Sequence, residues 1–514
     1  MSPGLDPVTL QVLAGAFRAI CEEMGAVLVR AAHSANIKER RDASTALFDA
    51  AGEMVMQAEH IPVHLGAMPD AVAAVRDHAQ EPGDAWLLND PYRGGTHLPD
   101  ITLVSPLFEG DTLLAFAASR AHHADVGGST PGSMPARSRS LDEEGVVIPP
   151  TRIAVGGRLD EALLRDLTGR MRGPRQREAD LLAQLAANRV AGARLAELVE
   201  RVGLGLVRAG MAEVLDYAER RTRASIERIP DGRYRARDVL EAEGGGELAI
   251  EVTVEVRGQD VAVDFAGTDP QSAGNLNCPL SVTKSAVYYV LRVATDPDIP
   301  ASAGAYRPVA VTAPGGCLVN ARPPAAVAGG NVETSSRIAD VVTLALGEAI
   351  PMPAQGQGTM NNLTLGNDAF TYYETLGGGQ GACPDADGPS AVHVAMSNTL
   401  NTPVEALEQE FPLRVRELAL RPGSGGAGTH RGGDGLVREV VAREAMTYSL
   451  LTERRAAAPK GARGGRPARP GKNLLRRVAG RLEELAAKAE GRLEPGDALR
   501  IETPGGGGFG PPAG

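Results

Sequence analysis

The chain has 514 residues, which corresponds to about three domain-sized units or to one large fold with sub-domains. Apolar residues make up 43% of it, enough for a substantial core, so a disordered protein or a small disulfide-stapled protein is excluded. The formal net charge of −11, from 53 basic and 64 acidic side chains, argues against a general affinity for nucleic acid or for anionic membranes.

No apolar run reaches the roughly 18 residues of a membrane span, because the longest candidate, residues 8–29, is interrupted by Arg18, Glu22 and Glu23. The N-terminal residues MSPGLDPVTL lack the basic and then apolar pattern of a secretory signal. We therefore predict a cytoplasmic protein with no membrane partner. The four cysteines form no CxxC pair, so neither a disulfide framework nor a thiolate zinc site is expected.

Apolar residues at helical spacing predict an amphipathic helix over residues 7–31. From residue 47 to about residue 152, short apolar or alternating runs between Gly and Pro predict strands and loops. Residues 176–229 return to helical spacing, with a division near Gly203 and Gly205 that predicts two helices in series.

Beyond residue 230, the segment LAIEVTVEVRGQDVAVDFAG alternates on both sides of RGQD and predicts a hairpin. Residues 279–295 and 335–350 are expected to be helical. The predicted class is α+β: a large mixed fold with an N-terminal helix, a β-rich metal-binding region, a central helical segment and a C-terminal mixed α/β region. We expect boundaries at 1–175 for the N-terminal metal-binding region, 176–230 for the helical segment and 231–514 for the C-terminal region with its Gly-rich loops.

The metal prediction rests on histidines, seven of which lie in the first 123 residues. In NDPYRGGTHLPDITLVSPLF, His97 and Asp100 share one loop, and a strand, the turn signal EGDT and a return strand ending in AHHAD follow. If Gly110 and Asp111 form a two-residue hairpin loop, His122 lies opposite Pro99. This register brings a second imidazole to the loop, but a slip of one residue would exchange His122 for His123.

Two imidazoles and a carboxylate suit a divalent transition metal with open coordination positions. A further carboxylate would complete the set, and spacing does not choose between Asp42 and Asp125. The competing interpretation is that these histidines hydrogen-bond loop backbone.

In QAEHIPVHLGAM, His60 and His64 have the spacing of a helical metal site, but Pro62 argues against the helix, so polar loop residues or partners of metal-binding carboxylates are favoured. Arg40 and Arg41 either bind an acidic substrate group or pair with surface carboxylates.

Several glycine-rich tracts, including GGGQGA, GSGGAGTHRGGDG and TPGGGGFG, are explained by tight turns and close backbone approaches. None is a P-loop, and no GxSxG nucleophile elbow is present. The polar segments QGQGTMNNL and NVETSSR either line a pocket or cap loops.

Together these segments resemble the hydantoinase B/oxoprolinase family, which includes the smaller subunit of ATP-dependent N-methylhydantoinases, the corresponding half of 5-oxoprolinase and the alpha subunit of acetone carboxylase. The resemblance runs from end to end. Its markers are NIKERRDASTALFD, QAEHIPVHLGAM, NDPYRGGTHLPDITLVSP, RAHHADVGG, GNLNCP, GGNVETSSRI, QGTMNNL, YYETLGGGQGA, NTPVEALE, SGGAGTHRGGDG and TPGGGGFG.

The resemblance implies a divalent metal ion (Zn, Mn or Fe) held by His97, Asp100, His122 and Asp42. It also implies a hetero-oligomer in which a hydantoinase A-like ATP-binding subunit uses ATP to phosphorylate a cyclic amide or imide substrate (a hydantoin, 5-oxoproline or a lactam). This chain, as the hydrolase subunit acting on the C–N bond, would complete ring opening. The proton-transferring base would be His123, Asp125, His60 or Glu59.

Two other functions are considered: a carboxylase subunit of the acetone carboxylase type, and a non-catalytic scaffold for an ATPase partner. The length of the chain suits the hydrolase branch better than the longer acetone carboxylase subunit.

Overall fold

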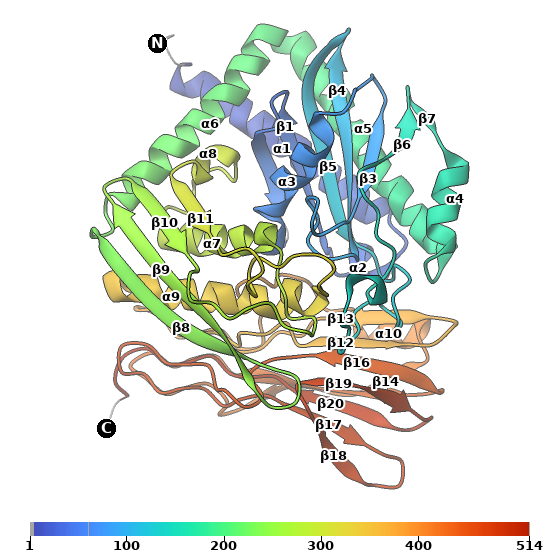
Figure 1. Ribbon diagram of the computed structural model, residues 1–514, viewed down its shortest axis with the longest axis vertical. Helices are drawn as coiled ribbons and strands as arrows, with labels where there is room; N and C mark the ends of the chain where they lie inside the picture. Colours follow the sequence, from blue (N-terminus) through green and yellow to red (C-terminus); the bar gives the residue numbers. More distant parts are fainter. Residues whose placement is uncertain (1–4, 60, 513–514) are drawn as a thin grey trace.

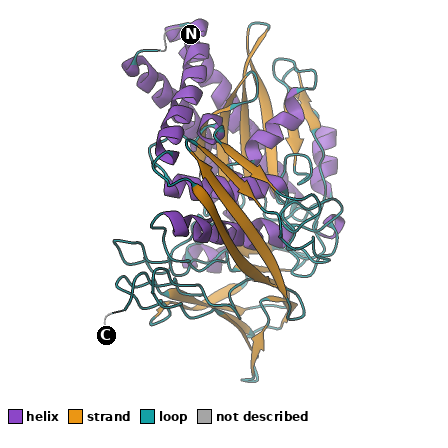
Figure 2. Ribbon diagram, turned by 60° about the vertical axis from the view of Figure 1, so that its left-hand side comes forward, coloured by secondary structure: helices purple, strands orange, loops and turns teal. Residues whose placement is uncertain are grey.

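The computed structural model describes residues 5–59 and 61–512 of the chain. In this part of the chain the strands form four sheets; the N-terminal half lies at one end of the molecule and the two C-terminal sheets lie at the other (Figure 1). Helices gather around the first sheet, whereas loops surround the C-terminal strands (Figure 2). The predicted α+β class is confirmed.

The first sheet is antiparallel and has the strand order β2-β1-β5-β4-β3-β6-β7. Its strands are β1 (Ala43–Asp49), β2 (Met54–Glu59), β3 (Ala85–Leu88), β4 (Asp100–Glu109), β5 (Thr112–His122), β6 (Thr151–Val155) and β7 (Arg158–Leu159). Three short helical segments lie beside these strands in the chain: α2 (Ala35–Lys38) before β1, η1 (Pro62–His64) after β2 and η2 (Leu141–Glu143) between β5 and β6.

Both faces of this sheet are covered by helices. On one face, α1 (Pro7–Ala31) and α5 (Pro174–Val202) share an apolar core with β1 and β5. On the other face lies α3 (Ala67–Arg76), which the sequence did not predict because it interrupts a region of strand-like runs. Its apolar residues Met68, Val72 and Val75 are buried against the sheet, and this packing stabilises a helix too short to be stable alone.

The N-terminal helix and the helix pair are confirmed. The side chain of Asp6 accepts hydrogen bonds from the backbone N–H groups of Val8 and Thr9, both at 3.1 Å, and so caps α1. Gly203 separates α5 from α6 (Leu204–Ile226) with a φ angle of 87°, which a residue with a Cβ rarely adopts. A shorter helix, α4 (Glu161–Gly169), precedes α5.

The second sheet has the order β11-β10-β9-β8 and packs on α7 and α9. The predicted hairpin is confirmed, since Arg257 of β9 pairs with Asp260 of β10. The elements of this region are β8 (Gly232–Glu241), β9 (Glu247–Arg257), β10 (Asp260–Asp264), α7 (Leu280–Ala294), α8 (Ala303–Tyr306), β11 (Val309–Thr312), the π-helical turn η3 (Gly330–Thr334) and α9 (Ser335–Ala349).

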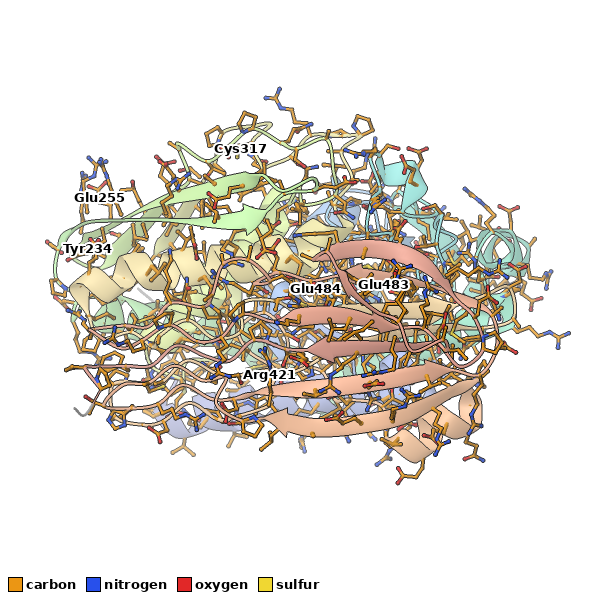
Figure 3. The ribbon with its side chains drawn as sticks, turned by 90° about the horizontal axis from the view of Figure 1, so that it is seen from below. Tyr234, Glu255, Cys317, Arg421, Glu483 and Glu484 are labelled. Carbon is orange, nitrogen blue, oxygen red and sulfur yellow. The ribbon has the colours of Figure 1, made fainter. Side chains whose placement is uncertain are left out.

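The third and fourth sheets share one apolar core, in which Leu363 and Leu365 meet Val440, Leu499 and Ile501. The third sheet consists of β13 (Thr371–Glu374), β12 (Asn362–Gly366), β16 (Met446–Leu451) and β19 (Lys488–Leu493). The fourth consists of β14 (Leu413–Arg421), β15 (Gly435–Ala442), β20 (Ala498–Glu502), β17 (Lys472–Arg476) and β18 (Leu482–Leu485), and α10 (Val404–Glu410) precedes it. Figure 3 shows these strands from below, with Arg421 on β14 and Glu483 and Glu484 on β18.

Three glycine-rich segments lie side by side next to these sheets. The N–H of Gly506 donates to the carbonyl of Gly433 at 2.9 Å, and the N–H of Gly433 donates to the carbonyl of Gln380 at 2.9 Å. A Cβ at Gly506 would lie 2.0 Å from the oxygen of Gln380. The predicted close backbone approach is confirmed, and these segments hold each other through backbone contacts that exclude side chains.

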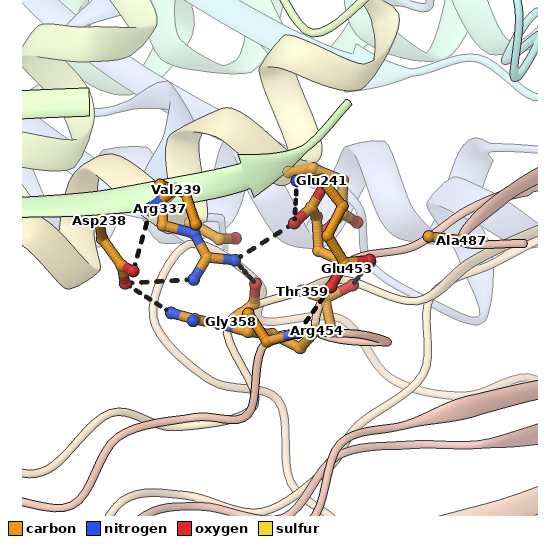
Figure 4. Close-up of polar contacts among 12 residues, drawn as sticks. Asp238, Val239, Glu241, Arg337, Gly358, Thr359, Glu453, Arg454 and Ala487 are labelled. Carbon is orange, nitrogen blue, oxygen red and sulfur yellow. Dashed lines mark hydrogen bonds and ion pairs between the residues drawn. The ribbon is translucent and has the colours of Figure 1, made fainter. Parts of the chain in front are cut away.

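A buried ion network joins the second sheet to the C-terminal half (Figure 4). The guanidinium of Arg337 on α9 lies 3.4 Å from Asp238 of β8 and 3.5 Å from Glu453, which follows β16. Arg454 contacts Asp238 at 2.9 Å and Asp340 at 2.7 Å. Each of these buried charges has an opposite charge beside it, because an unpaired one would be strongly destabilising.

Among the described residues, no helix has both the length and the apolar character that crossing a bilayer requires.

We predict that Gly506→Ala lowers the midpoint of thermal unfolding, because the new methyl group must displace the backbone at Gln380 and cost about 1–3 kcal/mol. The matched control is Gly15→Ala in α1, where a Cβ meets nothing within 4 Å. Differential scanning calorimetry of both variants checks the prediction; equal melting midpoints would contradict it.

Candidate metal centre

The candidate centre is built on the β4–β5 hairpin, whose predicted loop is confirmed by the pairing of Glu109 with Thr112. The predicted partner of His122 is wrong. A β-bulge follows the loop, since Phe108 pairs with Leu113 but Leu107 pairs with Ala115, and the extra residue moves the remaining register by one.

His122 therefore lies opposite Asp100 rather than Pro99. Residues directly opposite in a sheet point to the same face, so the imidazole and the carboxylate meet. Without the bulge, Ala121 would lie opposite Asp100 and the His122 ring would point to the other face.

Three side chains converge at this end of the hairpin. Nε2 of His97 lies 3.1 Å from Oδ1 of Asp100, and Nδ1 of His122 lies 3.3 Å from the same oxygen. One ligand atom from each residue falls within 4.8 Å of the others, and all three residues are at most 3% exposed. Nδ1 of His97 has no hydrogen-bond partner among the described residues, and the contact of its Nε2 with Asp100 lacks the geometry of a hydrogen bond. Two imidazoles and a carboxylate facing one point, with unused lone pairs, are a donor set for a divalent cation.

The second oxygen of Asp100 is held by neighbours. The hydroxyl of Thr96 donates to Oδ2 at 2.6 Å, and Nε2 of His64 lies 3.4 Å from it. Nδ1 of His64 is 2.9 Å from the hydroxyl oxygen of Ser44 on β1. His64 sits on the turn η1 and not on a helix, as Pro62 indicated, and it contacts the carboxylate. These contacts fix the orientation in which Oδ1 faces the two imidazoles.

Burial and charge act in opposite directions at Asp100. Burial by itself would raise the pKa of this carboxyl group, but the imidazoles, that of His97 first, hold the pKa well below its usual range. Burial lowers the pKa of His122, although Asp100 opposes this shift. These directions favour an ionised Asp100 and a neutral His122, and in those forms both side chains can bind a metal ion.

Asp42 lies next to this group, although its carboxylate is not one of the three converging groups. Its backbone carbonyl accepts a hydrogen bond from the N–H of His122 at 3.0 Å, and its side chain is 7% exposed. The charge of Asp42 also raises the pKa of His122, in opposition to burial. Asp42 is therefore a neighbour of the three converging residues.

His123 and Asp125 make contacts of a different kind. Nε2 of His123 lies 3.0 Å from the amide oxygen of Gln184 on α5, and burial lowers the pKa of His123 to about 4. The carboxylate of Asp125 accepts the N–H groups of Gly127 and Gly132, both at 2.7 Å, and pairs with Arg172 at 3.0 Å. Of the two other predicted residues, His60 lies outside the described residues, and of Glu59 only the backbone is described, paired with Ser44.

The sequence did not identify a residue that covers the centre from the C-terminal half. The ring of Tyr373 on β13 stacks on His122, with centroids 4.7 Å apart and planes at 12°. Arg40 lies over the same ring at 4.8 Å and donates to the Tyr373 carbonyl at 2.9 Å. Arg40 is fully buried, so it does not pair with a surface carboxylate as one alternative suggested. The segment YYETLGGGQGA marked the family resemblance, but nothing in it indicated contact with a residue 251 positions earlier.

Comparison with known proteins places this chain in a family. The model of the family described as hydantoinase B/oxoprolinase matches residues 6–512. 5-oxoprolinase 1 of Arabidopsis thaliana is 41% identical over 532 residues; the match covers 98% of this chain but only 42% of that protein's length. The B component of a putative D-/L-hydantoinase from a Pseudomonas strain is 31% identical, with 99% of this chain and 90% of that protein covered.

Solved structures show the same fold. The crystal structure of an ATP-dependent caprolactamase from Pseudomonas jessenii superimposes with a TM-score of 0.92 at 30% identity, covering 99% of this chain and 91% of the other. A nucleotide-free acetone carboxylase gives a TM-score of 0.89, with 98% and 76% covered, but its 18% identity shows a likeness of fold alone. Because the family model spans almost every residue and a relative 31% identical is covered over most of its length, this chain belongs to the hydantoinase B/oxoprolinase family.

Proposed function

We propose that this chain is the metal-dependent hydrolase component of an ATP-dependent enzyme that opens a cyclic amide or imide ring, such as a hydantoin, 5-oxoproline or a lactam. A hydantoinase A-like ATP-binding component phosphorylates the substrate, and this chain completes hydrolysis of the C–N bond within a hetero-oligomer. The observation that carries the proposal is the buried convergence of His97, Asp100 and His122. The names of the relatives, 5-oxoprolinase, D-/L-hydantoinase and ATP-dependent caprolactamase, supply the substrate class.

The donor set fits a divalent transition ion (Zn, Mn or Fe). Two imidazoles and one carboxylate leave coordination positions free, which distinguishes a catalytic site from a closed structural one. The ring of His97 supports this fit, because buried polar atoms normally form hydrogen bonds and its Nε2 faces Asp100 without forming one. Asp42 is the fourth ligand we propose, since its backbone already binds His122. When bound, the ion supplies Lewis acidity, which favours deprotonation of water and stabilises negative charge on a carbonyl oxygen.

A division of labour between two components has a chemical basis. Amide resonance resists attack by water, and phosphorylation of the carbonyl oxygen turns that carbon into a better electrophile with a stable leaving group. The chain has no P-loop, so a partner is expected to handle ATP. The residues of this chain then orient the activated amide and exclude bulk water, because the candidate ligands are almost completely buried.

A residue must also take a proton from the attacking water. We propose Glu59 or His60 for this step, because in the sequence these two residues precede the segment Pro62–His64, whose His64 contacts Asp100. His123 and Asp125 are engaged by Gln184 and Arg172, respectively, and we propose that they support the fold of the site.

We predict that wild-type chain purified after incubation with Zn²⁺, Mn²⁺ or Fe²⁺ retains about one ion per chain, and that His97→Ala and Asp100→Asn retain almost none. Inductively coupled plasma mass spectrometry measures the content. The matched control is His33→Ala, which removes an exposed histidine and leaves the content unchanged. Equal metal content in all variants would exclude this site.

Asp42→Asn is expected to weaken metal binding about tenfold or more, since it replaces an anionic ligand by a neutral amide of the same size. Competition with a chromophoric chelator gives the dissociation constant. An unchanged constant would show that the fourth ligand lies elsewhere, while the three-residue site would stand.

In the complete complex with its ATP-binding component, His122→Ala is expected to lower the rate of ring opening about a hundredfold or more while leaving assembly intact. Turnover and size-exclusion chromatography test both points. Undiminished turnover would favour a non-catalytic scaffold.

The carboxylase function has a separate test. It would be supported if the complex consumed ATP with a ketone only when bicarbonate was present.

A further inference from the structure

Glu333 is a buried acid outside the candidate ligands, and its backbone is unusual. It lies in the π-helical turn η3 (Gly330–Thr334), which leads directly into α9. π-Helical turns are rare and occur frequently at functional sites. Its side chain is fully buried, and it belongs to the polar segment NVETSSR, which the sequence left open between pocket lining and loop capping.

A chain of hydrogen bonds connects Glu333 to the candidate metal centre. Oε1 of Glu333 accepts the backbone N–H of Met360 at 3.1 Å and the side-chain amide of Asn362 at 2.8 Å. The amide oxygen of Asn362 in turn accepts the hydroxyl of Tyr373 at 2.8 Å. The ring of Tyr373 stacks on His122. Three side chains thus lead from the start of α9 to a candidate ligand.

The amide of Asn362 has only one orientation in this chain. Its nitrogen donates both to Glu333 and, at 2.7 Å, to the carbonyl of Leu451 on the adjacent strand β16, so its oxygen must face Tyr373. Loss of the Glu333 acceptor would leave this nitrogen with one partner and free the amide to turn.

The surroundings of Glu333 favour a neutral carboxylic acid. Burial, and then the charge of Glu453, raise the pKa of Glu333 to about 8, although Lys488 opposes the shift. Among the described residues, Oε2 makes no contact with the geometry of a good hydrogen bond, although the Thr359 hydroxyl lies close enough to oppose the rise of the Glu333 pKa. An ionised oxygen so poorly paired in the interior would be strongly destabilising. The charged or titratable groups that face it are Glu453, Lys488, Arg337, Arg455 and Tyr373.

We propose that Glu333 is a positioning residue of the candidate metal centre: its carboxyl group orients Asn362, and Asn362 fixes the Tyr373 ring against His122. The proposal rests on the function proposed above, in that the three converging residues hold a metal ion. Glu333 touches neither the ion nor the substrate. It determines the plane of the His122 imidazole, and therefore the direction in which the ring nitrogen presents its lone pair.

Binding of Co²⁺ alone to the full-length chain tests this role, because its visible absorption reports ligand geometry and needs neither substrate nor partner. Glu333→Gln keeps the accepting oxygen, and we expect a spectrum and an affinity within about twofold of wild type. Tyr373→Phe keeps the ring but removes its hydroxyl, and we expect a shifted spectrum and affinity about tenfold lower. Glu333→Ala should lower the Co²⁺ affinity by about the same factor as Tyr373→Phe.

Both residues act through Asn362. The double variant Glu333→Ala/Tyr373→Phe should therefore lose no more Co²⁺ affinity than the single variant with the larger loss. The proposal is overturned if the losses of Co²⁺ affinity in the two single variants add up in the double variant. It is also overturned if Tyr373→Phe leaves the spectrum unchanged, or if Glu333→Gln loses as much affinity as Glu333→Ala. If Glu333→Ala does not fold, Glu333→Gln and Tyr373→Phe still decide the outcome.

Two controls separate the possible failures. Asp340→Asn alters a neighbouring buried acid of α9 that belongs to the ion network, and it should reduce thermal stability without changing the Co²⁺ spectrum. His97→Ala tests the metal centre itself: if it binds Co²⁺ as wild type does, the proposed function fails. If His97→Ala loses Co²⁺ while Tyr373→Phe does not, only the positioning role fails.

Discussion

One extra residue in β5 determines which side chains meet at the candidate metal centre. The bulge near Leu114 shifts the hairpin register by one position, so that His122 and Asp100 occupy the same face of the sheet. Side chains alternate strictly along a strand, and a shift of one position exchanges every residue between the two faces. The same shift places the neighbouring His123 against α5, where its ring contacts the amide oxygen of Gln184. Two adjacent histidines thereby receive different environments.

Burial strengthens the interactions among His97, Asp100 and His122. In water, two imidazoles and a carboxylate would interact weakly, but in the interior their charges are poorly screened and their unpaired lone pairs are costly. The imidazoles hold the pKa of Asp100 low, and Thr96 and His64 engage its second oxygen. A bound cation would take up the lone pair of His97 Nε2, which faces Asp100 without the geometry of a hydrogen bond. The arrangement is therefore better suited to holding an ion than to stabilising the fold.

The C-terminal half covers the candidate centre with Tyr373, and other contacts join that half to the rest of the molecule. Tyr373 belongs to the sheet of β12, β13 and β16, and the buried ion pairs of Arg337 with Glu453 and of Arg454 with Asp340 join the end of β16 to α9. Backbone contacts between the glycine segments hold the surrounding loops together. Glu333 lies where these systems meet, since Glu453 of the ion network influences its pKa and Asn362 connects it to Tyr373.

The sequence by itself determined the N-terminal helix, the helix pair divided at Gly203, the RGQD hairpin and the loop of the β4–β5 hairpin, because these depend on local periodicity and turn residues. Spacing also brought His97 and Asp100 together with one of the two adjacent histidines, but only the family resemblance selected His122 over His123. Spacing did not reveal the bulge, since one extra residue leaves the apolar pattern almost unchanged. It also did not reveal α3, whose stability comes from packing on the sheet. Only the tertiary structure decided that Tyr373 stacks on His122 and that Asn362 links Tyr373 to Glu333. Contacts between residues hundreds of positions apart are set by sheet packing and buried charge, which leave no periodic trace in the chain.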